Sequence, residues 1–208
     1  MTRRIALTDG RLLDLDYFVE WRKWLWARPV QSALAFLGDI AGRRVLEIGG
    51  RSGRMAALFA LLGAEVTMLQ MGSTERARVE AEKWGVADRV RLLSSDGGFG
   101  PVSGETFEIV FTKSVLWCIP HLDEFLAEID GHLGPNGKVA FLENVRGGAI
   151  VSWLRESVIH RKGVSWAPHY HGITKEHLGL FRQRFDHVQI TRHGWFVYLI
   201  FGHKRTTT

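Results

Sequence analysis

Three glycines within five residues form the stretch of this chain best suited to hold a ligand. Gly49, Gly50 and Gly53 follow the apolar run Val45–Ile48 and precede the apolar segment Arg54–Leu62. The run predicts a short buried strand and the segment a buried helix. A strand, a glycine-rich turn and a helix bring bare backbone close to a cofactor and point helix N–H groups at it. The stretch therefore predicts a cofactor site.

A glycine-rich turn after the first strand is shared by folds that bind dinucleotides and folds that bind adenosylmethionine. The glycine spacing and two acids distinguish this turn from that of a dinucleotide-binding fold. A dinucleotide fold uses Gly-x-Gly-x-x-Gly, whereas the last glycine here comes one residue too early. Glu47, inside the first strand, is out of place in a dinucleotide binder. Asp96 follows the third expected strand, a position from which its carboxylate can accept a hydrogen bond from an adenine amino group. Adenosylmethionine is therefore the better candidate for the ligand.

Short apolar strands and helices alternate along most of the chain. This pattern is typical of a parallel sheet covered by helices on both faces, with ligands bound at the carboxyl ends of the strands. His193-Gly194 is short enough for a hairpin, so the final two strands should be antiparallel. Strands are expected at 44–48, 65–70, 89–93, 107–112, 138–142, 186–192 and 195–202. Helices are expected at 14–27, 29–39, 53–62, 74–84 and 122–133, with a later one carrying Leu178, Phe181 and Phe185. Arg28-Pro29 is expected to end the first of them.

Length and composition predict one globular protein of a reducing compartment. The 208 residues suffice for one domain with a full core, or a domain and a small lid. The net charge of +5 allows an anionic cofactor or substrate, but the charges are scattered, which favours nucleic acid only weakly. Cys118 is the only cysteine, so an internal disulfide is excluded. No apolar run approaches the ~20 residues of a membrane span, and a cytoplasmic location is expected.

Five segments together resemble the class I S-adenosylmethionine-dependent methyltransferases. Val45–Gly49 is similar to the first motif of that family, and Ser94–Gly97 to the segment whose acid contacts adenine. Phe107–Val110 resembles the fourth-strand motif, and Ser114–Pro120 the segment that follows it. His132–Lys138 resembles the Leu-x-Pro-Gly-Gly turn. The similarity covers roughly residues 40–145.

The resemblance implies a fold, a domain organisation and a cofactor. The fold is Rossmann-like α/β, a seven-stranded mostly parallel sheet with helices on both faces and an antiparallel last strand. Residues 1–208 form a single domain, with an N-terminal helical lid (1–40), a cofactor-binding core (41–145) and an acceptor-side insert with the last two strands (146–208). The cofactor is S-adenosyl-L-methionine, and no metal is expected. Cofactor contacts are expected from Tyr17, Glu47, Gly49, Gly50, Arg51, Gly53, Gln70, Met71, Asp96, Gly97 and Lys113.

Two positions depart from the family pattern. Arg51 stands where a second glycine is usual, and its side chain either crowds the turn or reaches toward the methionine carboxylate. Gln70 replaces the acid that usually ends the second strand and holds both ribose hydroxyls. An amide both accepts and donates, so Gln70 can hold the ribose with weaker charge assistance, unless Glu75 or another nearby group compensates. A binding or scaffold protein with altered or lost methyl transfer therefore stays an alternative.

The expected reaction is methyl transfer to oxygen or nitrogen of a small molecule. Thr112-Lys113-Ser114 lacks the Asn/Asp-Pro-Pro-aromatic sequence of enzymes that methylate amino groups of bases or glutamine. It also lacks the acid of metal-dependent catechol-type enzymes. A general base is needed only if the acceptor must lose a proton. His169 and His171 are the candidates, because histidine titrates near neutral pH, with surface or structural histidines as the alternative.

Aromatic residues predict the character of the partner. Trp117, Trp153, Trp166 and Tyr170 would wall a small-molecule acceptor pocket. Arg22–Arg28 interleaves basic and aromatic side chains, as surfaces that bind single-stranded nucleic acid do. Only seven residues carry that second signal, so an RNA-binding module is the weaker alternative and nucleic acid is not expected. No membrane partner is expected, and a homodimer is compatible with the sequence.

Overall fold

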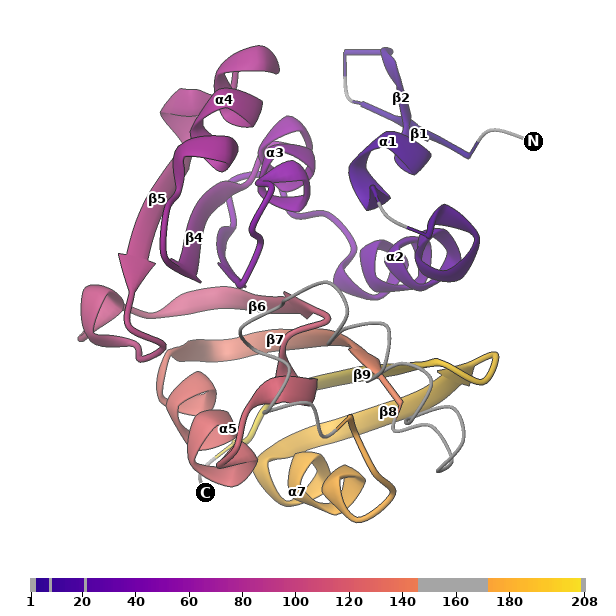
Figure 1. The fold of residues 1–208 in the computed structure, drawn as a ribbon, viewed down its shortest axis with the longest axis vertical. Coiled ribbons are helices and arrows are strands. Elements are labelled where there is room, and N and C mark those ends of the chain that lie inside the picture. Colours follow the sequence, from indigo (N-terminus) through magenta and orange to yellow (C-terminus); the bar gives the residue numbers. More distant parts are fainter. Residues whose placement is uncertain (1–2, 8, 21, 146–171, 207–208) are drawn as a thin grey trace, which may run out of the picture.

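One large sheet organises the chain in the computed structural model, which describes residues 3–7, 9–20, 22–145 and 172–206 (Figure 1). Its order is β5-β4-β3-β6-β7-β9-β8, with β3 to β7 parallel and β9 antiparallel to both of its neighbours. The predicted seven-stranded, mostly parallel sheet with an antiparallel last strand is confirmed. The strands are Arg44–Ile48 (β3), Glu65–Met71 (β4), Val90–Ser95 (β5), Phe107–Lys113 (β6), Leu133–Asn144 (β7), Phe185–His193 (β8) and Val197–Lys204 (β9).

Helices cover both faces of this sheet. Figure 1 shows α2 and α3 on one side of the sheet and α5 and α7 on the other. The helices are Leu15–Val19 (α1), Lys23–Leu37 (α2), Arg54–Leu61 (α3), Glu75–Lys83 (α4), Leu122–Gly131 (α5) and His177–Arg184 (α7). Single turns of 3-10 helix lie at Ala87–Arg89 (η1), Gly100–Val102 (η2) and Leu116–Cys118 (η3). Among the described residues, no helix has both the length and the apolar character needed to cross a membrane.

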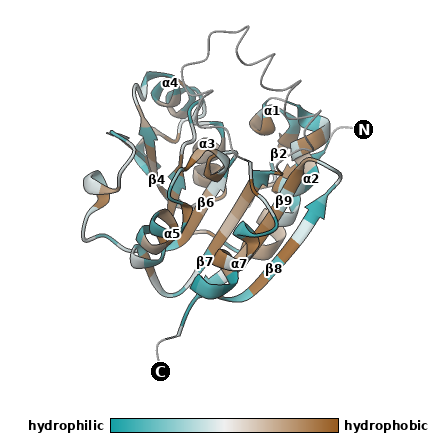
Figure 2. Ribbon diagram, turned by 60° about the horizontal axis from the view of Figure 1, so that its bottom comes forward, coloured by the Kyte–Doolittle hydropathy of each residue, from teal (hydrophilic) through white to brown (hydrophobic). Residues whose placement is uncertain are grey.

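Successive residues of the central strands belong to two separate apolar cores. Val45 and Phe111 pack toward α2, α3 and α4, whereas their neighbours Leu46 and Val110 pack toward α5 and α7. This follows from the alternation of side chains along a strand. Figure 2 shows the hydrophobic colour concentrated on the central strands β6 and β7, while α4 is largely hydrophilic. The central strands are therefore held from both sides, and their ends are fixed in space.

The order of the sheet reverses between β3 and β6. From β3 the chain proceeds outward through β4 and β5, then returns to place β6 on the other side of β3. Ile48 pairs with Thr112 across this junction, so both strands end at the same level. Ligands of doubly wound sheets bind outside the carboxyl ends of the strands at such a switch point. The glycine-rich turn after β3 lies at this point.

The N-terminal part differs from the single helix predicted over residues 14–27. A hairpin of Arg4–Ala6 (β1) and Leu12–Asp14 (β2) comes first, and no strand was expected there. Glu20 and Arg22 have positive φ angles of 67° and 52°, which separate α1 from α2. The division of the chain at residues 40 and 145 remains a prediction.

Proline does not end a helix where the sequence suggested. The prediction that Arg28-Pro29 stops the helix is wrong, because α2 continues through Pro29 to Leu37. Proline there lacks the N–H that would donate to the carbonyl of Leu25. The burial of one apolar stripe against β7 and β9 compensates for this loss. The buried α2 residues are Leu25, Trp26, Ala27, Pro29, Val30, Ala33 and Leu37.

Phe111 provides a test of the core beneath the glycine turn. It is fully buried, and its ring meets that of Phe59 edge-on with centroids 4.9 Å apart. We expect Phe111→Ala to lower the free energy of unfolding by about 3–5 kcal/mol, because it leaves a cavity between α3 and β6. Urea denaturation measures this. Val79→Ala, at an exposed position of α4, is the control and should change the value by less than about 0.5 kcal/mol.

Candidate functional site

The glycine-rich turn is in close contact with its surroundings on three sides. Gly49 has a φ of 76°, and a Cβ there would lie 2.5 Å from Val115 Cγ2. A Cβ on Gly50 would overlap the carboxyl group of Glu47. Gly53 caps α3 with a φ of 74°, and a Cβ there would lie 2.5 Å from the Cα of Ala77. The backbone of this turn is therefore bare of side chains at three of its five positions.

Glu47 lies directly beneath this turn. Its side chain is 2% exposed, and Oε2 has no hydrogen-bond partner within the described part of the chain. Burial raises the pKa of Glu47 to about 7, although Lys113 and the backbone of Ala56 act in the opposite direction. The bare turn above an incompletely satisfied acid, at the start of α3, leaves room for a polar ligand that approaches the backbone closely.

A second buried acid, Glu143, was not singled out from the sequence. It is fully buried near the carboxyl end of β7. Its carboxylate accepts from Thr112 Oγ1 at 2.7 Å and from the N–H of Val115 at 2.9 and 3.1 Å. Burial raises its pKa to about 7, and these hydrogen bonds oppose that effect. An acid at the end of the apolar run Val139–Leu142 was the available signal.

Lys113 provides a positive charge that interacts with both of these acids. Burial lowers the pKa of its ammonium group, while Glu47, Glu20 and Glu143 act in the opposite direction. The ammonium also lies 5.3 Å from the ring centroid of Trp26. Glu47, Lys113 and Glu143 thus form a charged cluster at the carboxyl ends of β3, β6 and β7, in which both acids are buried and the lysine is partly buried. Direct contact of Lys113 with a cofactor stays a prediction.

The turn after β6 is held by polar side chains. Ser114 has a φ of 62°, and its Oγ accepts from Asn144 Nδ2 at 2.5 Å. The indole N–H of Trp117 donates to the carbonyl of Ser114 at 2.7 Å, and the ring is only 8% exposed. Trp117 therefore fixes the turn that faces Gly49. Its role as an acceptor-pocket wall stays a prediction.

Gln70 presents a single acceptor atom at the end of β4. The residue is 5% exposed, and its Nε2 donates to the carbonyl of Ser73. The same turn is held by Ser94 Oγ, which donates to the carbonyl of Gly72 at 2.9 Å. In the described residues no group donates to Gln70 Oε1. The amide is thus oriented with its oxygen available, the atom that can accept from a hydroxyl group.

Three of the predicted residues form a rim beside Gln70. Met71 is 72% exposed, and its sulfur would lie 3.7 Å from a Cβ placed on Gly97. Asp96 is exposed, and its carboxylate accepts from the N–H of Gly98 at 3.2 Å. The structure therefore brings Met71, Asp96 and Gly97 together at the carboxyl ends of β4 and β5.

Tyr17 fastens α1 to the helices on its face of the sheet. Its hydroxyl donates to Glu80 at 2.6 Å and accepts from Lys83 at 2.5 Å. The guanidinium of Arg54 lies 4.3 Å from the ring centroid. These contacts occupy the side chain and hold the N-terminal segment on α3 and α4. Arg51, by contrast, is exposed on the glycine turn and has no hydrogen bond or ion pair with a described residue.

The histidines predicted as bases, His169 and His171, lie outside the described residues, as do Trp153, Trp166 and Tyr170. The chain re-enters the described part at Gly172, whose N–H donates to the carbonyl of Trp117 at 3.1 Å. In the Arg22–Arg28 segment, Trp24 is 66% exposed, but Leu25 and Trp26 are buried. A nucleic-acid surface there would have one exposed tryptophan.

Residues 46–141 match the profile of a methyltransferase domain. A stretch of 96 residues is 31% identical to the sterol 4-C-methyltransferase strm-1 of Caenorhabditis elegans, covering 45% of this chain and 28% of that protein. The chain thus spans less than a third of the length of this relative. The fold, the switch-point site and this match together define a methyltransferase domain.

Solved structures extend the similarity to nearly the whole chain. The N-methyltransferase NodS of Bradyrhizobium japonicum, in complex with S-adenosylhomocysteine, matches with a TM-score of 0.65 at 15% identity over 92% of this chain and 97% of that one. A Burkholderia thailandensis 1,6-didemethyltoxoflavin-N1-methyltransferase, with its substrate and S-adenosylhomocysteine bound, gives 0.66 at 20% identity over 89% and 80%. The chain thus has the fold of these methyltransferases, and its residues 46–141 match a methyltransferase domain.

The two buried acids predict how stability depends on pH. Their ordinary pKa of 4.5 is raised to about 7 in the folded chain, so between these values the folded state holds more protons than the unfolded one. The free energy of unfolding therefore falls as pH rises from about 5 to 7 and levels off above that. We expect Glu47→Gln or Glu143→Gln to reduce this fall, and the double variant to reduce it most.

Denaturation curves at each pH provide the measurement. Glu82→Gln, an exposed position of α4 that pairs with Arg78, is the control and should leave the slope unchanged. An unaltered pH slope in both single variants and the double variant would contradict the assignment of these two acids.

Proposed function

We propose that this protein binds S-adenosyl-L-methionine over the turn at Gly49–Gly53 and transfers its methyl group to oxygen or nitrogen of a small molecule. The observation that carries the proposal is the bare turn itself. Gly49 and Gly50 are in contact with Val115 and Glu47 underneath, so a side chain is excluded and the backbone is open to a ligand. That arrangement at the switch point of a doubly wound sheet suits an adenosine-containing cofactor.

Described residues would hold each part of the cofactor. Arg51 and the N–H groups at the start of α3 suit the methionine carboxylate. The arginine carries a full positive charge, and the N–H groups at a helix start carry partial positive charge. Gln70 Oε1 would accept a ribose hydroxyl. Asp96 would accept from the adenine amino group, with Met71 beside the ring. The bound cofactor supplies an electrophilic methyl group on a cationic sulfonium.

The protein's share of the chemistry is mainly orientation. Displacement at a methyl carbon needs the acceptor atom in line with the leaving sulfur, and fixed geometry supplies much of the acceleration. Glu143 holds the backbone of Val115, and Val115 in turn packs on Gly49. The turn after β6 and the turn after β3 are therefore held as one unit. This unit would set the position of the cofactor relative to an acceptor.

A hydroxyl or ammonium acceptor must also lose a proton. We assign this role to His169 or His171, which precede Gly172 in the sequence. Gly172 and Ile173 bond to the carbonyls of Trp117 and Asn144, beside the carboxyl ends of β6 and β7. Gly172, which directly follows these histidines in the sequence, thus lies at the edge of the sheet where the cofactor would lie.

We infer the acceptor's chemical class from the absence of base-methylation signals in the sequence and from the proteins that this chain resembles. The Burkholderia relative acts on 1,6-didemethyltoxoflavin, a small molecule, whereas the strm-1 relative is a sterol C-methyltransferase. Oxygen or nitrogen is preferred here because a histidine base suits an acceptor with an acidic proton. The protein is expected to act in the cytoplasm.

Cofactor binding is tested by thermal denaturation with S-adenosylhomocysteine. At a hundred times its Kd, the ligand should raise Tm by about 5–10 °C through mass action. Asp96→Ala should weaken binding about tenfold or more, because it removes an acceptor for the adenine amino group. Asp88→Ala, in η1 before the amino end of β5, is the matched control and should bind normally. No shift at millimolar ligand would remove the proposal.

The base is tested by measuring S-adenosylhomocysteine release with a panel of phenols and amines. If one of the histidines is the base, His169→Ala or His171→Ala should lower turnover by about 10²–10⁴-fold while cofactor affinity stays unchanged. His187→Ala, on β8, serves as the control. Normal turnover in both single variants and in the double variant would show that neither histidine acts as the base.

A further inference from the structure

A groove of about 800 Å³ opens between the segment after β5 and helix α5. At one end it includes Met71 and Gly97, which belong to the rim of the proposed cofactor site. It then continues along α5 from His121 to His132, which are eleven residues apart, a rise of about 16 Å along the helix axis. This length exceeds that of a purine ring. Most of the groove therefore lies beyond the cofactor site.

Aromatic rings form the far wall of the groove. Phe99 lies between two other rings, with its centroid 5.0 Å from that of Phe125 and 5.3 Å from that of His132. The ring of His132 is nearly parallel to Phe99, with an interplanar angle of 20°. Ile119 and Pro120 add apolar surface near the opposite end. A flat apolar group would find complementary surface here.

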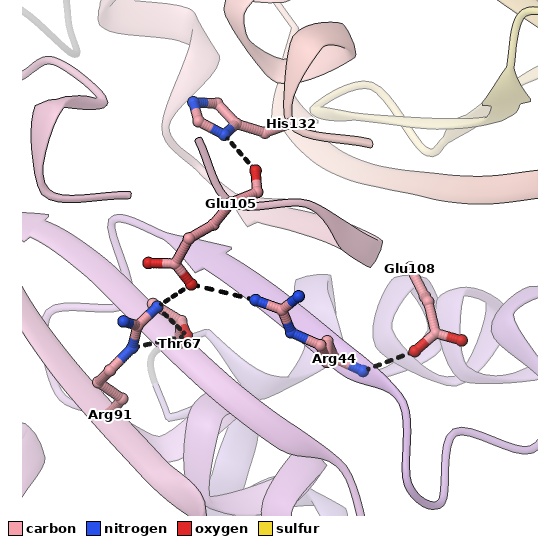
Figure 3. A network of polar contacts seen from close by, with 6 residues as sticks. All are labelled: Arg44, Thr67, Arg91, Glu105, Glu108 and His132. Carbon is pink, nitrogen blue, oxygen red and sulfur yellow. Dashed lines mark hydrogen bonds and ion pairs between the residues drawn. The ribbon is translucent and has the colours of Figure 1, made fainter. Parts of the chain in front are cut away.

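His132 places a hydrogen-bond acceptor at this wall. Its side chain is only 8% exposed, and Nδ1 lies 2.8 Å from the carbonyl oxygen of Glu105. A carbonyl can only accept, so Nδ1 donates, and in this tautomer Nε2 is an acceptor. Figure 3 shows the second ring nitrogen pointing away from Glu105. No described residue donates to it.

An ion-pair network fixes the backbone that orients His132. The carboxylate of Glu105 accepts from Arg91 at 2.6 Å and from Arg44 at 3.0 Å (Figure 3). Arg91 also contacts Thr67 Oγ1 at 3.1 Å. These contacts tie the loop before β6 to β3, β4 and β5. The acceptor nitrogen of His132 is thus presented by a rigid support rather than by a free side chain.

The charged side chains of the groove are acidic. Glu124 and Glu128 stand one turn apart on α5 and line it, and neither has an ion pair with any residue that the structure describes. No lysine or arginine is among its described lining residues. A ligand with a positive charge would therefore be preferred over a neutral or anionic one.

We propose that this groove is a second small-molecule site, which binds an arylalkylamine. The flat ring lies against Phe99 and Phe125, and a ring N–H donates to Nε2 of His132. The ammonium group faces Glu128 and Glu124, which lie one and two turns from His132 toward the start of α5. This ligand occupies the part of the groove beyond Met71, so it binds together with the cofactor and does not replace it.

Tryptamine is the probe, because it carries a flat ring, a ring N–H and an ammonium group. Its Kd is measured by calorimetry on the full chain, with and without S-adenosylhomocysteine. Binding is expected in both conditions, with NMR shifts confined to η2, α5 and the neighbouring Met71. Indole-3-propionate, the matched anion, should bind at least tenfold more weakly. No binding of tryptamine, or equal binding of the anion, overturns the proposal.

The ligand contacts are tested by changing the protein and, separately, by changing the ligand. The double variant Glu124→Gln and Glu128→Gln should weaken tryptamine about three- to tenfold. Asp123→Asn, an exposed acid of the same helix that does not line the groove, should leave binding unchanged. 1-Methyltryptamine, which lacks the ring N–H, should bind more weakly than tryptamine. Equal affinity of the two amines refutes the role of His132 without any change to the protein.

Competition separates this site from the cofactor site. If the two ligands bind together, the apparent Kd of tryptamine levels off as S-adenosylhomocysteine is raised. A Kd that keeps rising in proportion to S-adenosylhomocysteine means that both occupy one place, and the proposal is then wrong. The readout does not depend on methyl transfer. Failure of the amine to bind would leave the cofactor proposal intact.

Discussion

The buried charges at the switch point constrain everything built above them. Removing a carboxylate from water costs several kcal/mol unless hydrogen bonds and an opposite charge offset it. Glu143 meets this need by accepting from the backbone and side chain of the β6 end, while both acids interact electrostatically with Lys113. Glu143 is thus satisfied only when the ends of β6 and β7 are in register, whereas Glu47 keeps one carboxyl oxygen without a partner among the described residues. The geometry of the proposed site and the stability of the sheet depend on the same contacts.

Because of this constraint, the turn at Gly49–Gly53 has glycines that leave its backbone exposed. With Glu47 fixed below Gly50 and Val115 fixed below Gly49, any larger side chain in the turn would push the acid or the β6 loop away. Packing underneath therefore selects glycine, and the exposed backbone above is a consequence. Arg51, the non-glycine departure, does not disturb the arrangement because its side chain is exposed. Its position leaves the turn intact and adds a positive charge at the rim.

Local patterns predicted the sheet, whereas long-range contacts decided what they missed. Alternating apolar runs located β3 to β6 within two or three residues, because these strands are buried on both faces. Proline was expected to end the helix at Arg28, but burial of the α2 stripe against β7 and β9 outweighs the lost hydrogen bond. Glu143 was missed for a similar reason, since its partners Thr112 and Val115 lie about thirty residues earlier in the chain.

The two proposed ligand sites meet at Met71 and Gly97, and this has a thermodynamic consequence. Met71 is largely exposed, and its unbranched thioether can adopt several conformations at little cost. A ligand on either side that fixes this side chain removes an ordering cost that the other ligand would otherwise bear. The coupling must be reciprocal, because the affinity change that one ligand causes equals the change it experiences. An amine in the groove would therefore act on cofactor affinity through one side chain, without any movement of the charged cluster that positions the glycine turn.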